Sequence, residues 1–352
     1  MTPGPAIRFT PLRAAALLAA LLAAAVVAFL VAVRYGEQPI SLWAAFTQPE
    51  SFDATVLWSL RLKRALLAAI VGAALAASGS TLQSLLRNPL ADPFILGVSG
   101  GAAVGATLAL ALGAGTLASV GLLGGLARVS GPSFFAFLGS LGAMALVFGA
   151  ARARGRTSPL AALLAGVVFN AFAAAVVTFI KTLSSPERLG EILYWLAGTL
   201  GFEDGWTLVG AAALQAIAVG TMWLQSGRLN LLELGDEDAA ALGVPVERTR
   251  RILLLAASLS VAGAVTLSGL IGFVGLIVPH LLKLWLGPDQ RLLVPASALA
   301  GAAFLMLSDL AVRLLFVAFP QEQPVGVVTA LLGGPFFLLL LRRSDAQFDD
   351  AA

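Results

Sequence analysis

The sequence contains no cysteine and a single histidine. Without cysteine the chain can form no disulfide bond, no thiolate metal site and no cysteine nucleophile. The histidine, His280, stands among apolar residues, and the nearest carboxylate in the sequence is Asp289. A lone histidine in such surroundings is more typical of a structural hydrogen bond than of a metal ligand. We therefore predict no metal site and no cofactor.

Short enzyme motifs are also lacking. The chain has no His-Glu-x-x-His helix and no P-loop, and it contains no Gly-Lys pair at all. No cluster of histidines and carboxylates suggests a membrane-embedded enzyme. We predict that the protein has no catalytic residues, and that any ATP used in its function is bound by another polypeptide.

Charge is scarce as well. Charged residues make up 12% of the 352 residues and hydrophobic residues 59%, whereas about a quarter of a soluble domain is charged. A globule of this size could not hide so much apolar surface from water, so lipid must surround much of it. The net charge of +3 does not indicate nucleic acid, because the basic residues lie at the ends of apolar runs, where they indicate topology and lipid contact.

Apolar runs divide the chain into candidate membrane spans. A helix needs about 20 apolar residues to cross a bilayer, and the runs lie at 12–34, 62–86, 94–112, 133–151, 159–182, 205–224, 251–268, 270–286, 292–316 and 325–341. The first run resembles a signal peptide, but the residues after it form no small-residue cleavage site, so we expect it to be retained. The sequence predicts a single all-α membrane domain, 1–352, of about ten spans.

The arginines and lysines orient these spans. With ten crossings and an inside N-terminus, most of the basic residues fall at inside ends, as the positive-inside rule requires. Both termini are then cytoplasmic. The Gly-rich segment 114–131 is apolar enough to be a further short span, which would reverse the later topology; the basic residues favour the alternative in which it does not cross.

Two short helices are expected outside the spans. The segment 187–199 follows a Ser-Pro-Glu helix start and carries apolar residues at helical spacing, which predicts an amphipathic helix at the outer surface. The inside segment 235–243 opens with acidic residues, continues with alanines and ends at a glycine. A short exposed helix has little packing reason to exist alone, so we interpret it as a docking element for a cytoplasmic partner.

Polar and small residues within the spans leave alternatives open. Asp309 and Arg313 are spaced to pair on one helical face, which is a structural role; intramembrane charges are otherwise functional candidates. Asn170 and the glycines Gly97 and Gly101 can serve dense helix packing or line a transport pathway. An ion-coupled carrier would need more buried carboxylates than Asp309, which argues against secondary transport.

Several long motifs occur in order along nearly the whole chain. They are RLKR at 61–64, GAALAASG at 72–79, RNPLADP at 87–93, LGVSG at 96–100, LAG at 164–166, WLAG at 195–198, GDEDAAALG at 235–243, GFVGLIVPH at 272–280 and PVGVVTA at 324–330. In these motifs the sequence resembles the permease subunits of the ABC importers for iron-siderophore, haem and vitamin B12. Where the family usually has an arginine after the Pro-His pair, this sequence has Lys283.

The resemblance implies a homodimer in the bacterial inner membrane, with two cytoplasmic P-loop ATPase subunits and an outer substrate-binding protein as partners. By motif, Asn88 and Leu90 match a turn that gates the cytoplasmic end of the pathway, and Thr157 and Ser158 match a second gate loop less closely. The segment that matches the coupling helix contributes Gly235, Asp236, Glu237, Asp238, Ala239, Ala240, Leu242 and Gly243. Outward-facing basic positions that bind the acidic binding protein correspond to Arg61, Arg64 and Arg313.

The substrate is not readable from these motifs, because siderophore, haem and cobalamin permeases share them. A ferric siderophore is our first expectation, since that branch of the family is the largest, with cobalamin or haem as the alternative.

Overall fold

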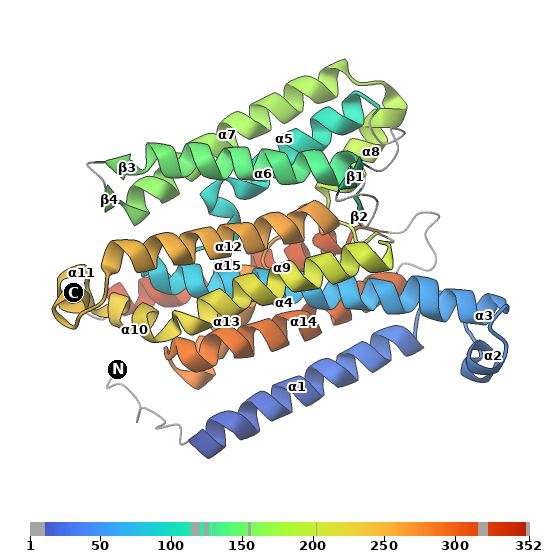
Figure 1. Ribbon diagram of the computed structural model, residues 1–352, viewed down its shortest axis with the longest axis horizontal. Coiled ribbons are helices and arrows are strands. Elements are labelled where there is room, and N and C mark those ends of the chain that lie inside the picture. Colours follow the sequence, from blue (N-terminus) through green and yellow to red (C-terminus); the bar gives the residue numbers. More distant parts are fainter. Residues whose placement is uncertain are drawn as a thin grey trace.

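The structure, a computed structural model, describes residues 11–113, 120–122, 127–129, 131–153, 156–201, 203–315 and 323–349. Figure 1 shows a bundle of long helices that run roughly along one common direction. The helices within the bundle are α1 (Pro11–Arg34), α4 (Leu62–Leu85), α5 (Val98–Ala111), α6 (Gly131–Ala150), α7 (Pro159–Leu183), α9 (Gly205–Leu224), α12 (Val246–Ser268), α13 (Val274–Leu286), α14 (Gln290–Leu315) and α15 (Val325–Asp349).

Shorter elements lie at the two ends of this bundle. One end carries α2 (Leu42–Thr47), α3 (Phe52–Ala54) and α8 (Pro186–Leu196), and the other carries α10 (Ser226–Leu234) and α11 (Asp236–Ala241). A π-helix, Thr55–Arg61, joins α3 to α4, and a 3-10 helix, Pro93–Leu96, precedes α5. Two hairpins pair β1 (Val120–Leu122) with β2 (Ala127–Val129) and β3 (Arg152–Ala153) with β4 (Arg156–Thr157).

Helix α4 lies at the centre of the bundle (Figure 1). The continuous helical stretch Phe52–Leu85 is 78% buried over its apolar window, whereas α1 is 11% buried. Glycines let the central helices approach closely: a Cβ on Gly72 would lie 2.2 Å from the Gly301 carbonyl oxygen of α14, and one on Gly79 would lie 1.8 Å from that of Gly275 in α13. In lipid the hydrophobic effect does not hold helices together, and close backbone packing at small residues takes its place. The glycine contacts of α4 with α13 and α14 therefore form the core of the bundle.

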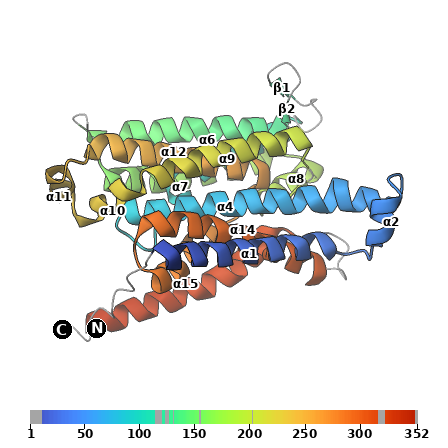
Figure 2. The ribbon, with the colours of Figure 1, turned by 60° about the horizontal axis from the view of Figure 1, so that its bottom comes forward.

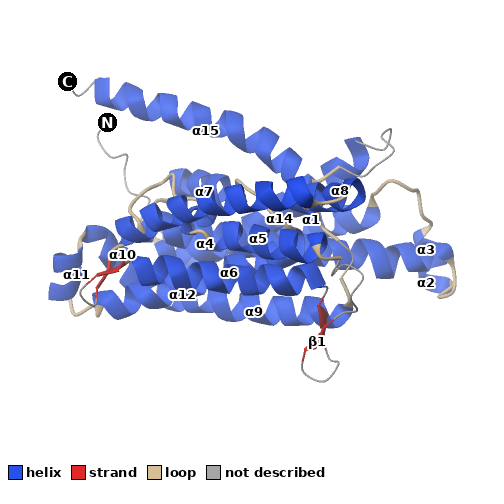
Figure 3. Cartoon of the chain, turned by 90° about the horizontal axis from the view of Figure 1, so that it is seen from above, coloured by secondary structure: helices blue, strands red, loops and turns tan. Residues whose placement is uncertain are grey.

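Helices α5, α6 and α7 form a second group beside the centre, next to α12 (Figure 2). Helix α15 leaves the bundle at an angle and extends away from the other helices toward its C-terminal end (Figure 3). Its first turns still pack on α13 and α14.

The predicted helical membrane fold is confirmed. Among the described residues, seven helices are long and apolar enough to cross a membrane, and three shorter apolar helices, in α5, α13 and α15, coincide with other predicted runs. Part of the segment 114–131 lies outside the described residues; its described parts are the strands β1 and β2, which form a hairpin. The start of α1 and the end of α15 lie at the end of the bundle that carries α11 (Figures 1 and 2), as an even number of crossings requires. The number of spans and the cytoplasmic termini stay predictions.

Candidate functional site

Three arginines gather at the end of the bundle opposite α11. Arg61, Arg64 and Arg313 are each 6% exposed. Arg64 donates from Nε and Nη2 to Asp309 Oδ1 at 2.8 and 2.7 Å, and Arg313 Nε lies 3.0 Å from Asp309 Oδ2. One buried carboxylate on α14 therefore holds two guanidinium groups, which offsets part of the desolvation of all three charges.

The same arginines fasten the C-terminal end of α1. Arg61 donates to the carbonyl oxygens of Arg34 and Gln38, and Arg313 donates to those of Ala32 and Tyr35. The last carbonyls of a helix lack intrahelical partners, so cations at this position satisfy them. A cavity of about 220 Å³ opens beside the cluster and is lined by all three arginines together with Phe52, Val56 and Leu60.

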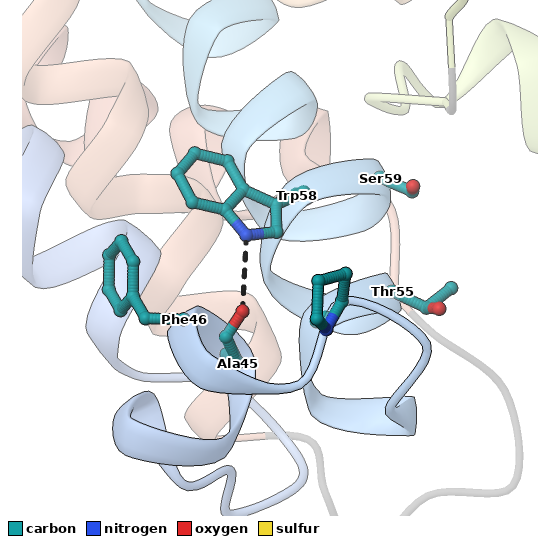
Figure 4. Close-up of a pocket in the computed structure, with 7 residues that line it drawn as sticks. Ala45, Phe46, Thr55, Trp58 and Ser59 are labelled. Atoms are coloured by element: carbon teal, nitrogen blue, oxygen red, sulfur yellow. Dashed lines mark hydrogen bonds between the residues drawn. The ribbon is translucent and has the colours of Figure 1, made fainter.

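Two aromatic residues, Phe46 and Trp58, pack together beyond this arginine cluster. Trp58 Nε1 donates to the Ala45 carbonyl oxygen at 3.4 Å, and its ring packs edge-on against Phe46 with centroids 5.4 Å apart (Figure 4). Since Phe46 belongs to α2 and Trp58 to the π-helix before α4, this contact folds α2 back onto the start of the central helix.

At the other end, the turn after α4 begins with a helix-ending motif. The amide of Asn88 donates to the Gln83 carbonyl and the amide of Arg87 to that of Ser84, which is the Schellman arrangement. Asn88 Oδ1 then accepts from the Leu90 amide at 2.9 Å. Asp92 caps the following 3-10 helix by accepting from the Phe94 amide at 2.7 Å, and burial raises the pKa of its carboxyl group. These hydrogen bonds give the turn 87–93 a defined shape.

The second predicted gate segment lies beside this turn. Ser158 caps α7 by accepting from the Ala161 amide, and Thr157 pairs with Arg152 in the β3–β4 hairpin; the Thr157 side chain lies outside the described residues. A cavity of about 330 Å³ is lined by Asn88 and Ser158, and also by Asp236 and Arg250. The structure thus brings the two predicted gate segments together with the predicted coupling helix.

Helix α11 occupies the predicted coupling segment. It starts after Gly235, whose φ of 140° suits glycine, and Gly243 follows it with a φ of 84°. Ala239 is fully buried against the bundle, and Leu242 is exposed. Glu237, Asp238 and Ala240 are also exposed, so the helix offers a surface that is acidic at its start and apolar at its end.

Asp236 ties α11 to two other elements. Its carboxylate accepts from Arg250 Nη2 of α12 at 2.7 and 2.8 Å and from Arg87 Nη2 at 3.0 Å. The hydrogen bond from Arg250 is the largest cause that lowers the pKa of Asp236. The carboxylate is therefore ionised at neutral pH and joins the turn after α4 to α12.

The pathway candidates take packing positions in this chain. A Cβ on Gly101 would lie 2.2 Å from the Gly139 carbonyl oxygen of α6, so this glycine allows α5 and α6 to touch. Gly97 has a φ of 81° and ends the 3-10 helix. Asn170 Nδ2 donates to the Phe94 carbonyl at 2.9 Å and so holds α7 to the 3-10 helix. Any role in lining a pathway stays a prediction.

Comparison with known proteins decides the family. The FecCD transport family matches residues 10–343. The chain belongs to the FecCD transport family. It is 44% identical over 304 residues, 86% of this chain and 77% of the relative, to the cobalamin import system permease protein BtuC of Halobacterium salinarum. To the hemin transport system permease protein HmuU of Yersinia pestis it is 40% identical, over 87% of this chain and 88% of the relative.

A solved structure shares the arrangement of this FecCD protein. It is described as a metal-chelate type ABC transporter in an inward-facing conformation; it matches with a TM-score of 0.80 and 31% identity, over 94% of this chain and 99% of that chain. The FecCD protein is therefore a multi-pass transport permease of the bacterial inner membrane and not itself a catalytic subunit. No group of histidines and carboxylates suited to a metal ion occurs within the described part of the chain.

Sequence reasoning missed three contacts of this FecCD permease. It paired Asp309 with Arg313 but not with Arg64, and it did not connect Arg87 with Asp236. It also drew no role from Lys283, whose Nζ lies 3.6 Å from Glu233 Oε1, a carboxylate that also accepts from Ser84 Oγ. Each missed contact joins residues on separate elements that are at least 50 positions apart in the sequence, and one sequence carries no signal for such pairs.

Proposed function

We propose that two copies of this permease form the pathway of an ATP-driven importer, with two cytoplasmic P-loop ATPase subunits and an outer substrate-binding protein. The observation that carries the proposal is the inner cavity, because it is shared by the turn at Asn88, the loop at Ser158 and the helix that contains Asp236. Motion of the exposed helix α11 can reach the proposed gate because α11 and both gate segments line the same cavity.

Helix α11 is the proposed site for the ATPase. Leu242 and the neighbouring Leu234 both expose more than half of their surface, and exposed apolar side chains rimmed by acidic ones are typical of a protein contact. Ala239 faces the bundle instead, so its replacement would disturb packing rather than docking. We therefore choose Leu242→Asp to test the contact, with Leu224→Asp as a control at a leucine that is more exposed, 78% against 60%, and lies at the end of α9.

The assay uses vesicles that contain the permease together with a candidate ATPase subunit and a candidate binding protein. Removing a central interface residue costs about 2 kcal/mol or more, so the Leu242 variant should bind the ATPase about tenfold or more weakly and lose stimulated hydrolysis. Hydrolysis that responds normally to the binding protein in Leu242→Asp would refute α11 as the contact.

The arginine cluster is the proposed site for the binding protein. Its three guanidinium groups line one cavity at the outer end. An acidic side chain that entered this cavity would lie beside positively charged groups, which is the complementarity that guides a charged partner. Arg61 is the residue to test, because Arg64 and Arg313 also hold Asp309. In Arg61→Gln the affinity for the binding protein should fall and depend less on salt; an unchanged affinity at low salt would exclude this role.

The proposed substrate is a metal chelate, with a ferric siderophore placed first and cobalamin or haem as the alternative. Support comes from the neighbour described as a metal-chelate type transporter and from the relatives named for cobalamin and hemin. Titrating the partner binding protein with ferrichrome, hemin and cyanocobalamin decides among them. Tight binding of cyanocobalamin or hemin alone would move the assignment away from siderophores.

Ion-coupled transport is the competing class. Within the described spans the buried carboxylate Asp309 is already engaged by two arginines, which accounts for it as a structural counter-ion. Uptake into vesicles should continue when the proton gradient is collapsed and stop when ATP is omitted. The opposite result would favour the carrier.

A further inference from the structure

The contact between Arg87 and Asp236 connects the two inner features described above. Arg87 is the first residue of the turn that leads to Asn88, and Asp236 is the first residue of α11. Arg87 Nη2 lies 3.0 Å from Asp236 Oδ1, and Nε and Nη2 of the same guanidinium donate to the Leu232 carbonyl at 3.0 and 2.6 Å. One side chain therefore grips the last turn of α10 and the first turn of α11.

Arg87 has a backbone conformation that arginine rarely adopts. Its φ of 49° is left-handed, at the position after a helix where glycine is strongly preferred because it has no Cβ to clash. Arginine at this position is energetically less favourable than glycine for the turn itself. The gain must come from the side chain, whose described contacts are those to α10 and α11.

The stability of the fold offers little explanation for the ion pair. The Arg87 and Asp236 side chains are 45% and 50% exposed, and exposed pairs contribute little to stability. Arg250, only 9% exposed on its side chain, fixes the other side of the Asp236 carboxylate to α12. Asp236 thus lies between the buried guanidinium of Arg250 and the half-exposed side chain of Arg87, which directly precedes Asn88 in the turn.

We propose that Arg87 is a positioning residue that transmits displacement of α11 to the turn at Asn88 and Leu90, with Asp236 as the joint. The proposal rests on the proposed function, because it assigns a mechanical link between the coupling helix and the gate of that importer. When α11 moves, the guanidinium of Arg87 moves with it, and the left-handed residue that begins the turn rotates.

The absence of cysteine from the sequence allows a clean reporter of the turn. Leu90→Cys places one thiol in the gate turn without touching the hydrogen bond from the Leu90 amide to Asn88 Oδ1. In inside-out vesicles with the assembled ATPase, the labelling rate of this thiol by an impermeant maleimide is compared between the nucleotide-free and the ADP–vanadate states. The reporter without further substitutions should label at different rates in the two states.

Three variants of the Leu90→Cys reporter distinguish loss of the Arg87–Asp236 contact from a general loss of folding. Arg87→Gly keeps, and by its backbone preference favours, the left-handed turn but removes the side chain. Asp236→Asn keeps the size of the joint but removes its charge, and Arg87→Lys keeps the positive charge. Arg248→Gln, which removes an exposed arginine of α12, is the matched control for charge.

We expect Arg87→Gly and Asp236→Asn to lose the nucleotide-dependent difference in labelling, Arg87→Lys to restore part of it, and Arg248→Gln to retain it. ATPase assembly and thermal stability are measured in each variant, and Arg87→Gly should melt no lower than the reporter. A full labelling difference in Arg87→Gly would overturn the link while leaving the gate assignment intact. If the reporter itself labelled equally in both states, the gate assignment would fail, and the link with it.

Discussion

Arg64 and Asp309 are 245 positions apart in the sequence, yet their side chains form a 2.7 Å ion pair that is almost completely buried. This pair connects the central helix α4 to α14 at the end of the bundle opposite α11, and Arg313 also pairs with the Asp309 carboxylate. The shared carboxylate therefore fixes the positions of both the Arg64 and the Arg313 guanidinium groups.

Removing the Asp309 carboxylate should show how much its ion pairs with Arg64 and Arg313 stabilise the fold. Breaking a buried pair by removing one partner costs about 3–5 kcal/mol, so Asp309→Asn should lower the melting temperature of the purified permease clearly. Glu50→Gln, which removes one negative charge from an exposed loop, serves as the control and should melt like the wild type. Equal melting temperatures for the two variants would show that Asp309 is not a structural counter-ion.

Two glycines that look alike in the sequence should respond in opposite ways to alanine. A Cβ at Gly101 would lie 2.2 Å from a backbone oxygen of α6, whereas one at Gly142 meets nothing within 4 Å. Gly101→Ala should therefore destabilise the protein by about 1–3 kcal/mol through overpacking. Gly142→Ala should be neutral or stabilising by up to about 1 kcal/mol, since alanine favours the helix.

Thermal unfolding in one detergent, with both variants side by side, gives this comparison directly. A Gly101→Ala protein as stable as Gly142→Ala would mean that α5 and α6 do not touch at this glycine, and it would reopen the pathway role of Gly101.

The loop before α9, which contains Glu203, should make the stability of the protein depend on pH. Desolvation, and then the neighbouring Asp204 carboxylate, raise the pKa of Glu203 from 4.5 to about 7. The folded state therefore holds this proton more tightly than the unfolded chain, so the group is neutral without penalty at low pH. The penalty develops as pH rises through the unfolded pKa toward the folded one, and it is complete above that value.

Glu203→Gln, which cannot ionise, should be more stable than the wild type at about pH 8 and equal to it near pH 4. Melting temperatures across this range test the sign of the effect. A variant that gains stability at acidic pH instead would contradict it.

The amide of Gln215 should be coupled to Ser260. Gln215 Nε2 donates to the Ser260 carbonyl at 2.9 Å, and Ser260 Oγ donates to Gln215 Oε1 at 2.6 Å, which joins α9 to α12. Interhelical hydrogen bonds in membrane proteins contribute about 0.6 kcal/mol on average and up to about 1.7. Gln215→Leu and Ser260→Ala should each destabilise the protein, and the double variant should lose less than the sum.

Such a double-mutant cycle needs unfolding free energies of the four proteins in one detergent. Strict additivity would mean that the two side chains do not interact. This result also tests a contact between two helices that only the structure supplies.

Much of the fold could be predicted because its signals are local. The apolar runs anticipated α1, α7 and α9 almost residue by residue, and the capping pattern around 235–243 anticipated α11 at Asp236–Ala241. The weakest local signal was the Gly-rich segment 114–131, where the described residues form a β-hairpin rather than a helix. Glycine favours neither structure strongly, so hydrophobicity alone could not decide.

The sequence by itself determined that this chain is a helical membrane protein and which runs are apolar enough to cross lipid, and its motifs indicated its family. The helices and apolar runs depend on hydrophobicity and helix capping, which act over a few neighbouring residues. Only the tertiary structure decided that Asp309 belongs to Arg64 as well as to Arg313, that Ala239 faces inward, and that Arg87 reaches α11. These contacts join residues far apart in the chain, and their geometry follows from how closely the glycine-bearing helices pack.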